Sequence, residues 1–239
     1  MKAIVLAAGK GVRMQSDLPK VLHELKGKPL LKHVTDTLKA SGVEEIVLVV
    51  GYRGELVKEQ MGDEFTYAYQ YEQLGTAHAV LQAEQCLTGY TGPVIITCGD
   101  APMISKQSYL ALVNSYESGA SAAVLTMQPE NPYGYGRIVK DADGFVCRIV
   151  EEKDASDEER LIGEVNVGTY IFESTTLFDG LKKTGNNNAQ NEYYLPDMIA
   201  YVNNLGGKIS AVKVSSPVEG AGVNSREQLA VLEGISDAG

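Results

Sequence analysis

The 239-residue chain has few cysteines, no long basic run and no long hydrophobic run, and each absence excludes a class of protein. Its three cysteines, Cys86, Cys98 and Cys147, form no CxxC pair, which argues against a zinc site or disulfide framework. A formal net charge of −10 argues against nucleic-acid binding, which needs a concentrated positive face. No stretch could span a membrane, and the first apolar run ends at Ala8, too early for a secretory signal. We therefore expect a cytoplasmic protein that binds neither nucleic acid nor membrane.

Two common phosphate-binding motifs are also missing. The dinucleotide fingerprint G-x-G-x-x-G fails because Met14 replaces its third glycine, and no P-loop spacing occurs anywhere in the chain. The chain instead opens with KAIVLAAGKGVRM (residues 2–14), where an apolar run meets two glycines and basic residues follow. Backbone N–H groups of such a loop can approach a phosphate, and Arg13 and Lys20 can neutralise it. The alternative interpretation is a plain turn between a strand and a helix.

Apolar segments alternate with amphipathic segments along the first half of the chain. This pattern predicts strands at residues 4–6, 45–50, 65–70, 93–98 and 121–127, and helices at 29–40, 76–87 and 105–117. Continuous apolar strands that alternate with helices indicate an α/β protein with a mostly parallel sheet and helices on both faces. The second half predicts a hairpin at 137–150, strands at 164–172 and 208–214, and helices at 194–202 and from about residue 224. We expect this half to form a lobe grafted onto the sheet.

Two polar residues are candidate metal ligands. Asp100 follows the predicted strand 93–98, and open α/β sheets bind ligands at the carboxyl ends of their strands. A carboxylate beside a phosphate there suits Mg²⁺, although an aspartate between glycine and proline also suits an ordinary turn. Asn224 offers a second oxygen, but Ser225 and Gln228 have the spacing of a capping box, so this stretch has a purely structural alternative as a helix start.

Several longer motifs occur in the order that is typical of one enzyme family: LAAGKGVRM with LPKVL, QLGTAHAV, CGDAPMIS, YGYGRIV, IVEEKDA, NNNAQNEYYLPDMI and VEGAGVNSREQL. Over nearly its whole length the chain resembles the uridylyltransferase domain of bacterial N-acetylglucosamine-1-phosphate uridylyltransferases, within the sugar-nucleotidyltransferase family. The opening motif indicates only the wider class, whereas residues 73–80 and 186–199 are more specific. The resemblance implies a Rossmann-like, mostly parallel mixed sheet with helices on both faces and an inserted β-rich sugar-binding lobe.

The resemblance also implies an activity. It is the Mg²⁺-dependent transfer of UMP from UTP to N-acetylglucosamine 1-phosphate, giving UDP-N-acetylglucosamine and pyrophosphate for cell-wall (peptidoglycan) precursor synthesis. Two alternatives remain open: a nucleotidyltransferase for another sugar 1-phosphate, and a non-catalytic nucleotide-sugar binding protein. The implied division is a nucleotidyltransferase domain over 1–227 and the start of a C-terminal helix or linker over 228–239. No β-helix acetyltransferase domain is expected in this sequence, and a trimer is expected only if such a domain is present.

Individual residues match functional positions of this family. Arg13, Lys20 and Asp100 match catalytic positions, and Asp100 with Asn224 matches the Mg²⁺ ligands. The positions that match nucleotide contacts are Leu6, Ala7, Ala8, Gly9, Lys20, Gln70, Gly75 and Thr76. Those that match the amino-sugar pocket are Gly136, Glu151, Asn166, Tyr194 and Asn224.

The chain also departs from the family pattern at three positions. Val12, Cys98 and Val167 replace a threonine, an aromatic residue and a threonine that are usual at these places. Each departure lies at a predicted pocket edge, so it puts ligand affinity in question more than the chemistry. His78, at the start of a predicted helix, is expected to be structural rather than catalytic.

Overall fold

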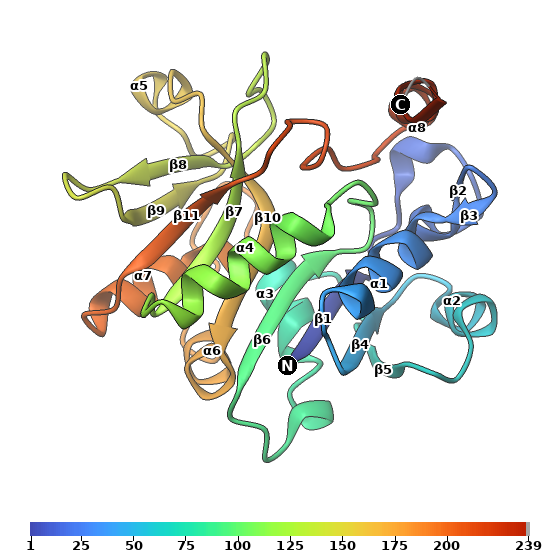
Figure 1. Ribbon diagram of the computed structural model, residues 1–239, viewed down its shortest axis with the longest axis horizontal. Coiled ribbons are helices and arrows are strands. Elements are labelled where there is room, and N and C mark those ends of the chain that lie inside the picture. Colours follow the sequence, from blue (N-terminus) through green and yellow to red (C-terminus); the bar gives the residue numbers. More distant parts are fainter. Residues whose placement is uncertain (238–239) are drawn as a thin grey trace.

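A mixed nine-stranded sheet runs through residues 1–237, the part of the chain that the computed structural model describes (Figure 1). Its main path has the order β11-β7-β10-β6-β1-β4-β5, and β8 and β9 branch from β10. The pairs β1–β4, β1–β6, β4–β5 and β7–β11 are parallel, whereas β10 runs antiparallel to β6, β7 and β8. The strands are β1 (Lys2–Ala7), β4 (Glu45–Val50), β5 (Thr66–Tyr69), β6 (Pro93–Cys98), β7 (Ala122–Met127), β8 (Arg137–Lys140), β9 (Val146–Val150), β10 (Val165–Glu173) and β11 (Ile209–Lys213).

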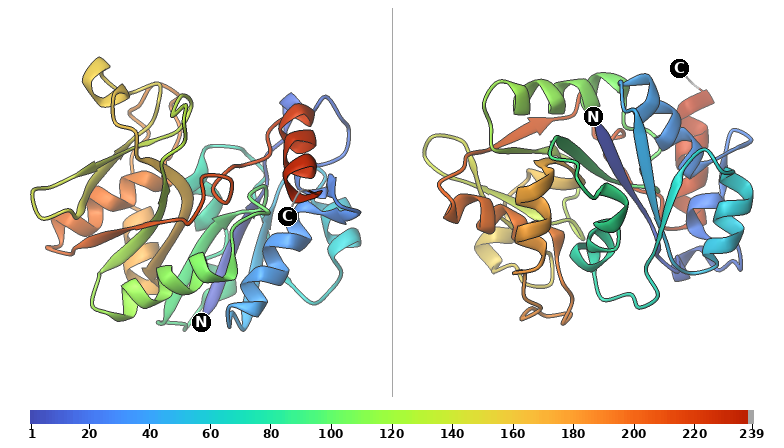
Figure 2. Two further views of the ribbon diagram at one scale, coloured as in Figure 1. Left: turned by 45° about the horizontal axis from the view of Figure 1, so that its top comes forward. Right: turned by 90° about the horizontal axis from the view of Figure 1, so that it is seen from below.

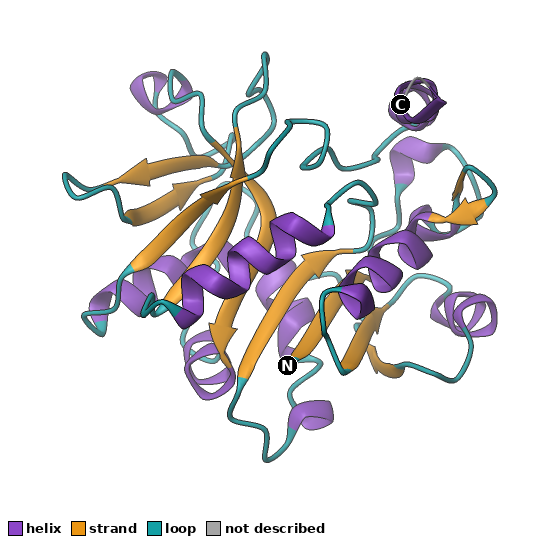
Figure 3. Ribbon diagram, in the orientation of Figure 1, coloured by secondary structure: helices purple, strands orange, loops and turns teal. Residues whose placement is uncertain are grey.

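Helices cover both faces of this sheet, as the sequence predicts (Figure 2). The helices α1 (Leu30–Ala40), α2 (Gly54–Met61) and α4 (Lys106–Glu117) contribute to the core on one face. The helices α3 (Thr76–Leu81), α6 (Ser174–Leu181) and α7 (Met198–Asn204) contribute to the core on the other. Figure 3 shows the helical layers on either side of the strands. No helix within residues 1–237 is long and apolar enough to cross a membrane.

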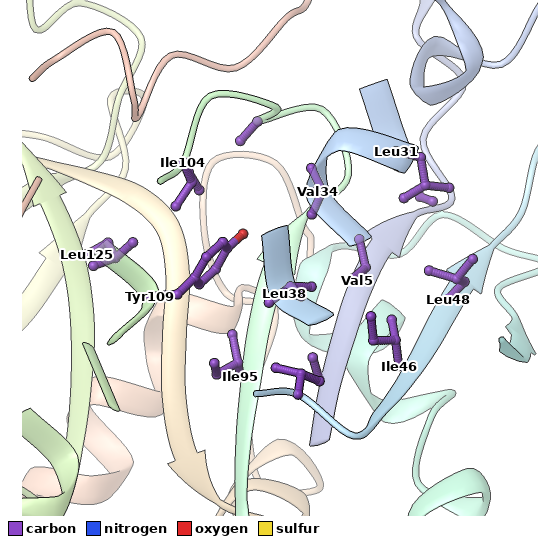
Figure 4. Close-up of a cluster of buried hydrophobic side chains, with 14 of the residues drawn as sticks. Val5, Leu31, Val34, Leu38, Ile46, Leu48, Ile95, Ile104, Tyr109 and Leu125 are labelled. Carbon is purple, nitrogen blue, oxygen red and sulfur yellow. The ribbon is translucent and has the colours of Figure 1, made fainter. Parts of the chain in front are cut away.

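Alternate residues of each central strand enter opposite cores, because successive side chains of a strand point to opposite faces. In β1, Val5 joins the core under α1 and α4, whereas Ile4 joins the core against α3 and α6. In the first core, Val5 and Ile95 lie beside Leu38 of α1, and Leu48 lies on the side of Leu31 (Figure 4). The strands are therefore apolar on both sides, which explains the uninterrupted apolar runs of the sequence.

The second half of the chain extends this sheet. The hairpin of β8 and β9 joins β10 through the pair Val165 and Arg137. The register of β10 against β7 shifts between Asn166 and Tyr170, where Gly168 has a φ of +81°. β10 is curved, and the hairpin lies to one side of the main strands (Figure 1), so the β-rich lobe expected from the sequence is a continuation of the sheet.

The short elements lie mostly in the loops. They are the 3₁₀ helices η1 (Val12–Met14), η2 (Lys20–Leu22), η3 (Gln85–Leu87) and η4 (Leu195–Asp197), the strands β2 (Glu24–Leu25) and β3 (Lys28–Pro29), and the helix α5 (Asp157–Arg160). The last helix, α8, spans Arg226–Asp237 and so crosses the predicted boundary between residues 227 and 228. The last two residues of the predicted C-terminal segment, 238–239, lie outside the described residues.

Some predicted helices differ from the structure. The helix predicted at 76–87 ends at Leu81, because Gln82 and Ala83 make tighter i→i−3 backbone hydrogen bonds with Ala79 and Val80. The helix predicted at 194–202 begins as the 3₁₀ turn η4, which contains Pro196. Helices α2 and α6 were not expected from the sequence.

Candidate functional site

A cavity of about 270 Å³ opens at the carboxyl ends of β1, β5 and β6. It gathers all eight residues that the sequence assigns to the nucleotide, together with Asp100. Its lining comprises Leu6, Ala7, Ala8, Gly9, Lys20, Val21, Gln70, Gln73, Gly75, Thr76, Ala79, Cys98, Asp100 and Glu192. Four segments that lie far apart in the chain therefore contribute to one cavity, at the sheet edge where parallel α/β folds bind their ligands.

The glycine-rich loop after β1 is shaped by the approach of Lys20. Gly11 has a φ of +59°, and a Cβ atom at this position would lie 2.6 Å from the Cβ of Lys20. A side chain there would therefore both strain the backbone and displace Lys20. At Gly9, by contrast, an added Cβ would meet no atom within 4 Å. Of the two glycines in the motif, Gly11 is the one that this packing requires.

Lys20 joins the two predicted metal ligands. Its Nζ forms an ion pair with Asp100 and donates a hydrogen bond to Oδ1 of Asn224 at 2.9 Å. The backbone N–H of Val223 donates to the carbonyl of Asp100 at 2.8 Å, which fastens the loop before α8 to the end of β6. Residues that are 80 and 204 positions apart thus meet around one ammonium group.

This arrangement fits a Mg²⁺ ion held partly by substrate. Within residues 1–237 no group of three or more His, Cys, Asp or Glu side chains is arranged to hold a metal. Asp100 and Asn224 nevertheless direct two oxygens at one cation, the Lys20 ammonium. Mg²⁺ commonly takes one or two protein oxygens and completes its shell with phosphate and water oxygens. The two residues therefore suit the ion that the sequence predicts.

Asn224 also takes part in the start of α8. Ser225 Oγ accepts from the backbone N–H of Gln228 at 3.3 Å, and Gln228 Oε1 accepts from the backbone N–H of Asn224 at 2.7 Å. The predicted capping interaction is thus present, with its return bond one residue earlier than in a standard capping box. Because Gln228 accepts from the backbone N–H of Asn224, the side-chain oxygen of Asn224 remains available to Lys20.

Arg13 is not brought into the lining of the cavity. It is exposed, at the middle of η1, and makes no hydrogen bond or ion pair with any described residue. The loop that carries it is fixed from the other side, because Arg226 of α8 donates to the carbonyls of Met14 and Gln15 at 3.0 and 3.2 Å. The Arg13 guanidinium therefore has no partner within residues 1–237, although the loop that carries it is anchored to α8.

Three residues assigned to the sugar pocket lie together at the ends of β8, β9 and β10. A Cβ atom on Gly136 would lie 2.9 Å from Cγ2 of Ile149 and 3.1 Å from Oε1 of Glu151, so a glycine lets both side chains approach the backbone closely. The backbone N–H of Asn166 donates to the carbonyl of Gly136 at 2.8 Å. The Asn166 side chain is oriented by two bonds, from Nδ2 to the hydroxyl of Tyr170 at 2.6 Å and from the backbone N–H of Gly168 to Oδ1 at 2.9 Å.

The polar groups of this lobe are strongly affected by burial. Burial, with Asp154 and Glu151 nearby, raises the pKa of Tyr194 to about 12, and its hydroxyl is buried without a hydrogen-bond partner in the described chain. Burial, with Asp154 and Asp197 nearby, also raises the pKa of Glu151 above its ordinary value. The nearby Gln190 side chain partly offsets this rise in the pKa of Tyr194, but the hydroxyl has no well-formed hydrogen bond, so it is open to a polar ligand.

The three departures from the family pattern differ in their surroundings. Val12 is exposed, so its side chain does not contribute to the core. Cys98 lines the cavity, and burial with the nearby Asp100 carboxylate raises the pKa of its thiol to about 12, which makes it an unreactive wall. Val167 is buried, and a Cβ on Gly220 would lie 2.7 Å from its Cγ2, so this side chain supports the loop before α8.

Sequence reasoning assigned no contact to four other lining residues, Val21, Gln73, Ala79 and Glu192. All four lie within motifs that the resemblance rests on: Val21 in LPKVL, Gln73 and Ala79 in QLGTAHAV, and Glu192 in NNNAQNEYYLPDMI. Their place in these motifs was the available signal. Val21 of η2 and Ala79 of α3 are small and apolar. Apart from their place in the motifs, nothing in the sequence distinguishes them from ordinary core residues.

Comparisons with known proteins are consistent with this geometry. The family model described as nucleotidyl transferase matches residues 2–210. The bifunctional protein GlmU of Halalkalibacterium halodurans is 50% identical over 235 residues, which cover 98% of this chain and 51% of that protein. The bifunctional protein GlmU of Geobacter metallireducens is 46% identical over 233 residues, with 96% and 49% coverage. The chain thus spans about half the length of the curated relatives it matches.

A solved structure shares the fold at low sequence identity. A putative glucose-1-phosphate thymidylyltransferase from Bacillus anthracis, solved in complex with a sucrose, superposes with a TM-score of 0.77 and 19% identity. The match covers 99% of this chain and 95% of that one. At this identity the likeness shows that the mixed sheet and its helical layers form the same architecture.

Proposed function

This chain belongs to the nucleotidyl transferase family, and we propose that it transfers UMP from UTP to N-acetylglucosamine 1-phosphate, releasing pyrophosphate. One observation carries the proposal: the cavity gathers every residue assigned to the nucleotide, next to the cluster of Lys20, Asp100 and Asn224. The relatives named bifunctional protein GlmU, at 46–50% identity, support the choice of this substrate pair. We further propose that residues 1–227 form the transferase unit and that it acts in the cytoplasm to supply cell-wall precursor synthesis.

The chemistry follows from what these side chains can do. A phosphate oxygen of the sugar phosphate is already an anion, so it attacks the α-phosphorus of UTP without a general base. Lys20, and Arg13 from its anchored loop, would neutralise the charge of the leaving pyrophosphate. Bound to Asp100 and Asn224, Mg²⁺ would supply further neutralisation of phosphate charge. Positioning by the cavity walls therefore accounts for the rest of the catalysis.

The sugar would lie between the nucleotide cavity and the lobe. Glu151, Asn166 and Tyr194 offer an acceptor, an oriented amide and an unpartnered hydroxyl for its hydroxyls and acetamide. A site that pairs its polar groups with an acetamide leaves them unsatisfied when the acetamide is absent. We therefore expect N-acetylglucosamine 1-phosphate to be preferred over glucosamine 1-phosphate and glucose 1-phosphate.

The test is pyrophosphate release by the purified chain with UTP, Mg²⁺ and each of the three sugar phosphates. The expected kcat/KM for the N-acetylated sugar exceeds the other two by about tenfold to a hundredfold. Asn166→Ala should narrow this preference, whereas the matched variant Lys20→Ala should lower turnover with every sugar. Equal kcat/KM values for all three sugar phosphates would contradict the proposed sugar preference and favour a nucleotidyltransferase of another specificity. Binding of UDP-N-acetylglucosamine without any turnover would favour a nucleotide-sugar binding protein.

A further inference from the structure

The side chain of Gln70 is held at one end by two partners. Gln70 directly follows β5, is 4% exposed and lines the nucleotide cavity. Its Nε2 lies 3.1 Å from the carbonyl oxygen of Gly75 and 3.0 Å from Nδ1 of His78. Each contact is within hydrogen-bonding distance, so both N–H bonds of the amide are used inside the protein.

The contact with Gly75 distinguishes the nitrogen from the oxygen of the Gln70 amide. A carbonyl oxygen can only accept, so the group that faces it must be the NH₂ of Gln70. The second N–H then points at Nδ1 of His78, which must accept and therefore carries no proton. His78 is thus the tautomer with its proton on Nε2. Oε1 of Gln70 has no partner among residues 1–237 and is left for whatever occupies the cavity.

Both partners of Gln70 are rigidly placed. Gly75 has a φ of +115°, and a Cβ there would lie 2.4 Å from the carbonyl oxygen of Tyr193. Ala77, in the first turn of α3, donates its N–H to that same carbonyl at 2.9 Å. Oγ1 of Thr76 accepts from the N–H of Leu195 at 2.9 Å. The segment around Tyr193 therefore fastens the start of α3, and with it His78, against the cavity wall.

A fixed acceptor in this cavity distinguishes nucleobases by their pairing edge. Uracil carries an N–H at N3, which can donate to a carbonyl oxygen. Cytosine has an unprotonated N3, whose lone pair is repelled by a carbonyl oxygen. We propose that His78 is a positioning residue that holds the Gln70 amide with its oxygen toward the base and so makes the site select uridine over cytidine nucleotides. This inference rests on the proposed function for its substrate class.

Loss of the His78 acceptor would remove this constraint. With leucine at position 78, one N–H of Gln70 would be buried without a partner. The amide would then be held by the Gly75 carbonyl alone, and because a buried unpaired donor is costly, it would gain by directing its free N–H toward the cavity, where N3 of cytosine accepts it. The expected effect is therefore a change in base preference, which a general loosening of the fold would not produce.

The experiment compares UTP with CTP as substrates for the wild-type chain and three variants. His78→Leu should narrow the ratio of kcat/KM values for UTP and CTP by about tenfold, mainly through a higher KM for UTP, with kcat within about twofold. His78→Asn should restore most of the ratio, because its Oδ1 can accept near the position of Nδ1. His33→Leu is the matched control, because His33 lies on α1, does not line the cavity, and donates a hydrogen bond to the carbonyl of Leu25 in β2; its UTP/CTP ratio should not change.

An unchanged UTP/CTP ratio in folded His78→Leu would overturn the proposal, whether the two kcat/KM values stay as they are or fall by the same factor. Where His78→Leu does not fold, His78→Gln gives the same comparison, because its oxygen lies near the position of Nε2 instead of Nδ1. Calorimetric binding of UDP and CDP repeats the comparison without turnover. A wild-type chain that binds UDP over CDP, loses this preference in His78→Leu and yet transfers nothing from UTP would refute the proposed function while supporting the assignment of His78.

Discussion

At the scale of single residues, Asp100 has two partners that make its contribution testable. It pairs with Lys20 and faces Asn224 across the same ammonium group. Asp100→Ala removes a proposed Mg²⁺ ligand, and we expect kcat/KM for pyrophosphate release to fall by about a hundredfold or more. The measurement is steady-state release at ordinary Mg²⁺, with a thermal melt to show that the variant is folded.

A matched control comes from α1. Asp36, like Asp100, forms ion pairs with lysine, here with Lys28 at 2.7 Å and Lys32 at 2.8 Å, but it does not line the nucleotide cavity. Asp36→Ala should leave kcat/KM unchanged, because exposed ion pairs contribute little and this one touches no ligand. Near-normal turnover of Asp100→Ala would remove Asp100 from the proposed catalytic group.

Glu151 and its neighbour Glu152 have opposite effects on the pH dependence of stability. Burial, with Asp154 and Asp197 nearby, raises the pKa of Glu151 above its ordinary 4.5, so the folded state holds this proton more tightly than the unfolded chain does. Its carboxyl therefore destabilises the fold as the pH rises through that raised pKa. Glu151→Gln should raise the melting midpoint by about a few degrees near pH 8, and the gain should shrink toward pH 4.

Glu152 supplies the control with reversed sign. The backbone N–H of Gly134 and the Arg137 guanidinium lower its pKa, so its charged form stabilises the fold above its ordinary pKa and this stability is lost as the pH falls. Glu152→Gln should therefore lower the midpoint near pH 8, the more so because Arg137 is buried. Melting midpoints near pH 8 that move in the same direction in Glu151→Gln and Glu152→Gln would contradict the opposite pKa shifts of the two carboxyl groups.

At the scale of elements, the junction between β5 and α3 depends on Gly75. Gly75→Ala would place a Cβ 2.4 Å from the Tyr193 carbonyl oxygen on a backbone with φ of +115°. We expect a loss of about 2–4 kcal/mol in the free energy of unfolding, from strain and displaced backbone together. The KM for UTP should rise as well, because the Gly75 carbonyl also orients Gln70.

Gly42 is the matched position for this change. Its φ is +89°, but a Cβ there would meet no atom within 4 Å. Gly42→Ala should cost only the backbone strain, about 1 kcal/mol, and leave the KM for UTP unchanged. Urea unfolding and steady-state kinetics of both variants make the comparison, and equal stability losses would show that the contact with Tyr193 can relax.

At the scale of the whole molecule, the lobe and the main sheet should unfold together, because β10 hydrogen-bonds to β6, β7 and β8. Ile46 of β4 and Ile138 of β8 are both buried, in the cores on opposite faces. Ile46→Val and Ile138→Val should each cost about 1 kcal/mol and shift one common calorimetric transition. Their costs should add within about 0.5 kcal/mol in the double variant. Two transitions, each moved by only one variant, would show that the lobe is a separate unit.

Local sequence determined much of this fold. Strands β4 and β6 have the bounds that their apolar runs predict, because a strand buried on both faces needs apolar side chains at every position. The sequence did not predict helix α6, because this segment contains Thr175, Thr176 and Gly180, which are poor helix formers. Its glycine is explained by packing instead, since a Cβ on Gly180 would lie 2.4 Å from Cε of Met198 in α7.

The motifs of the sequence named the residues of the cavity, but only the tertiary structure decided how they act on one another. That Lys20 bonds Asn224, that Arg13 is left outside the lining, and that His78 orients Gln70 follow from contacts between segments distant in the chain. Local sequence specifies backbone propensity and the side-chain period, which involve neighbours within a few residues. Contacts between distant segments depend on how whole strands and helices pack, and this information is spread over the entire chain.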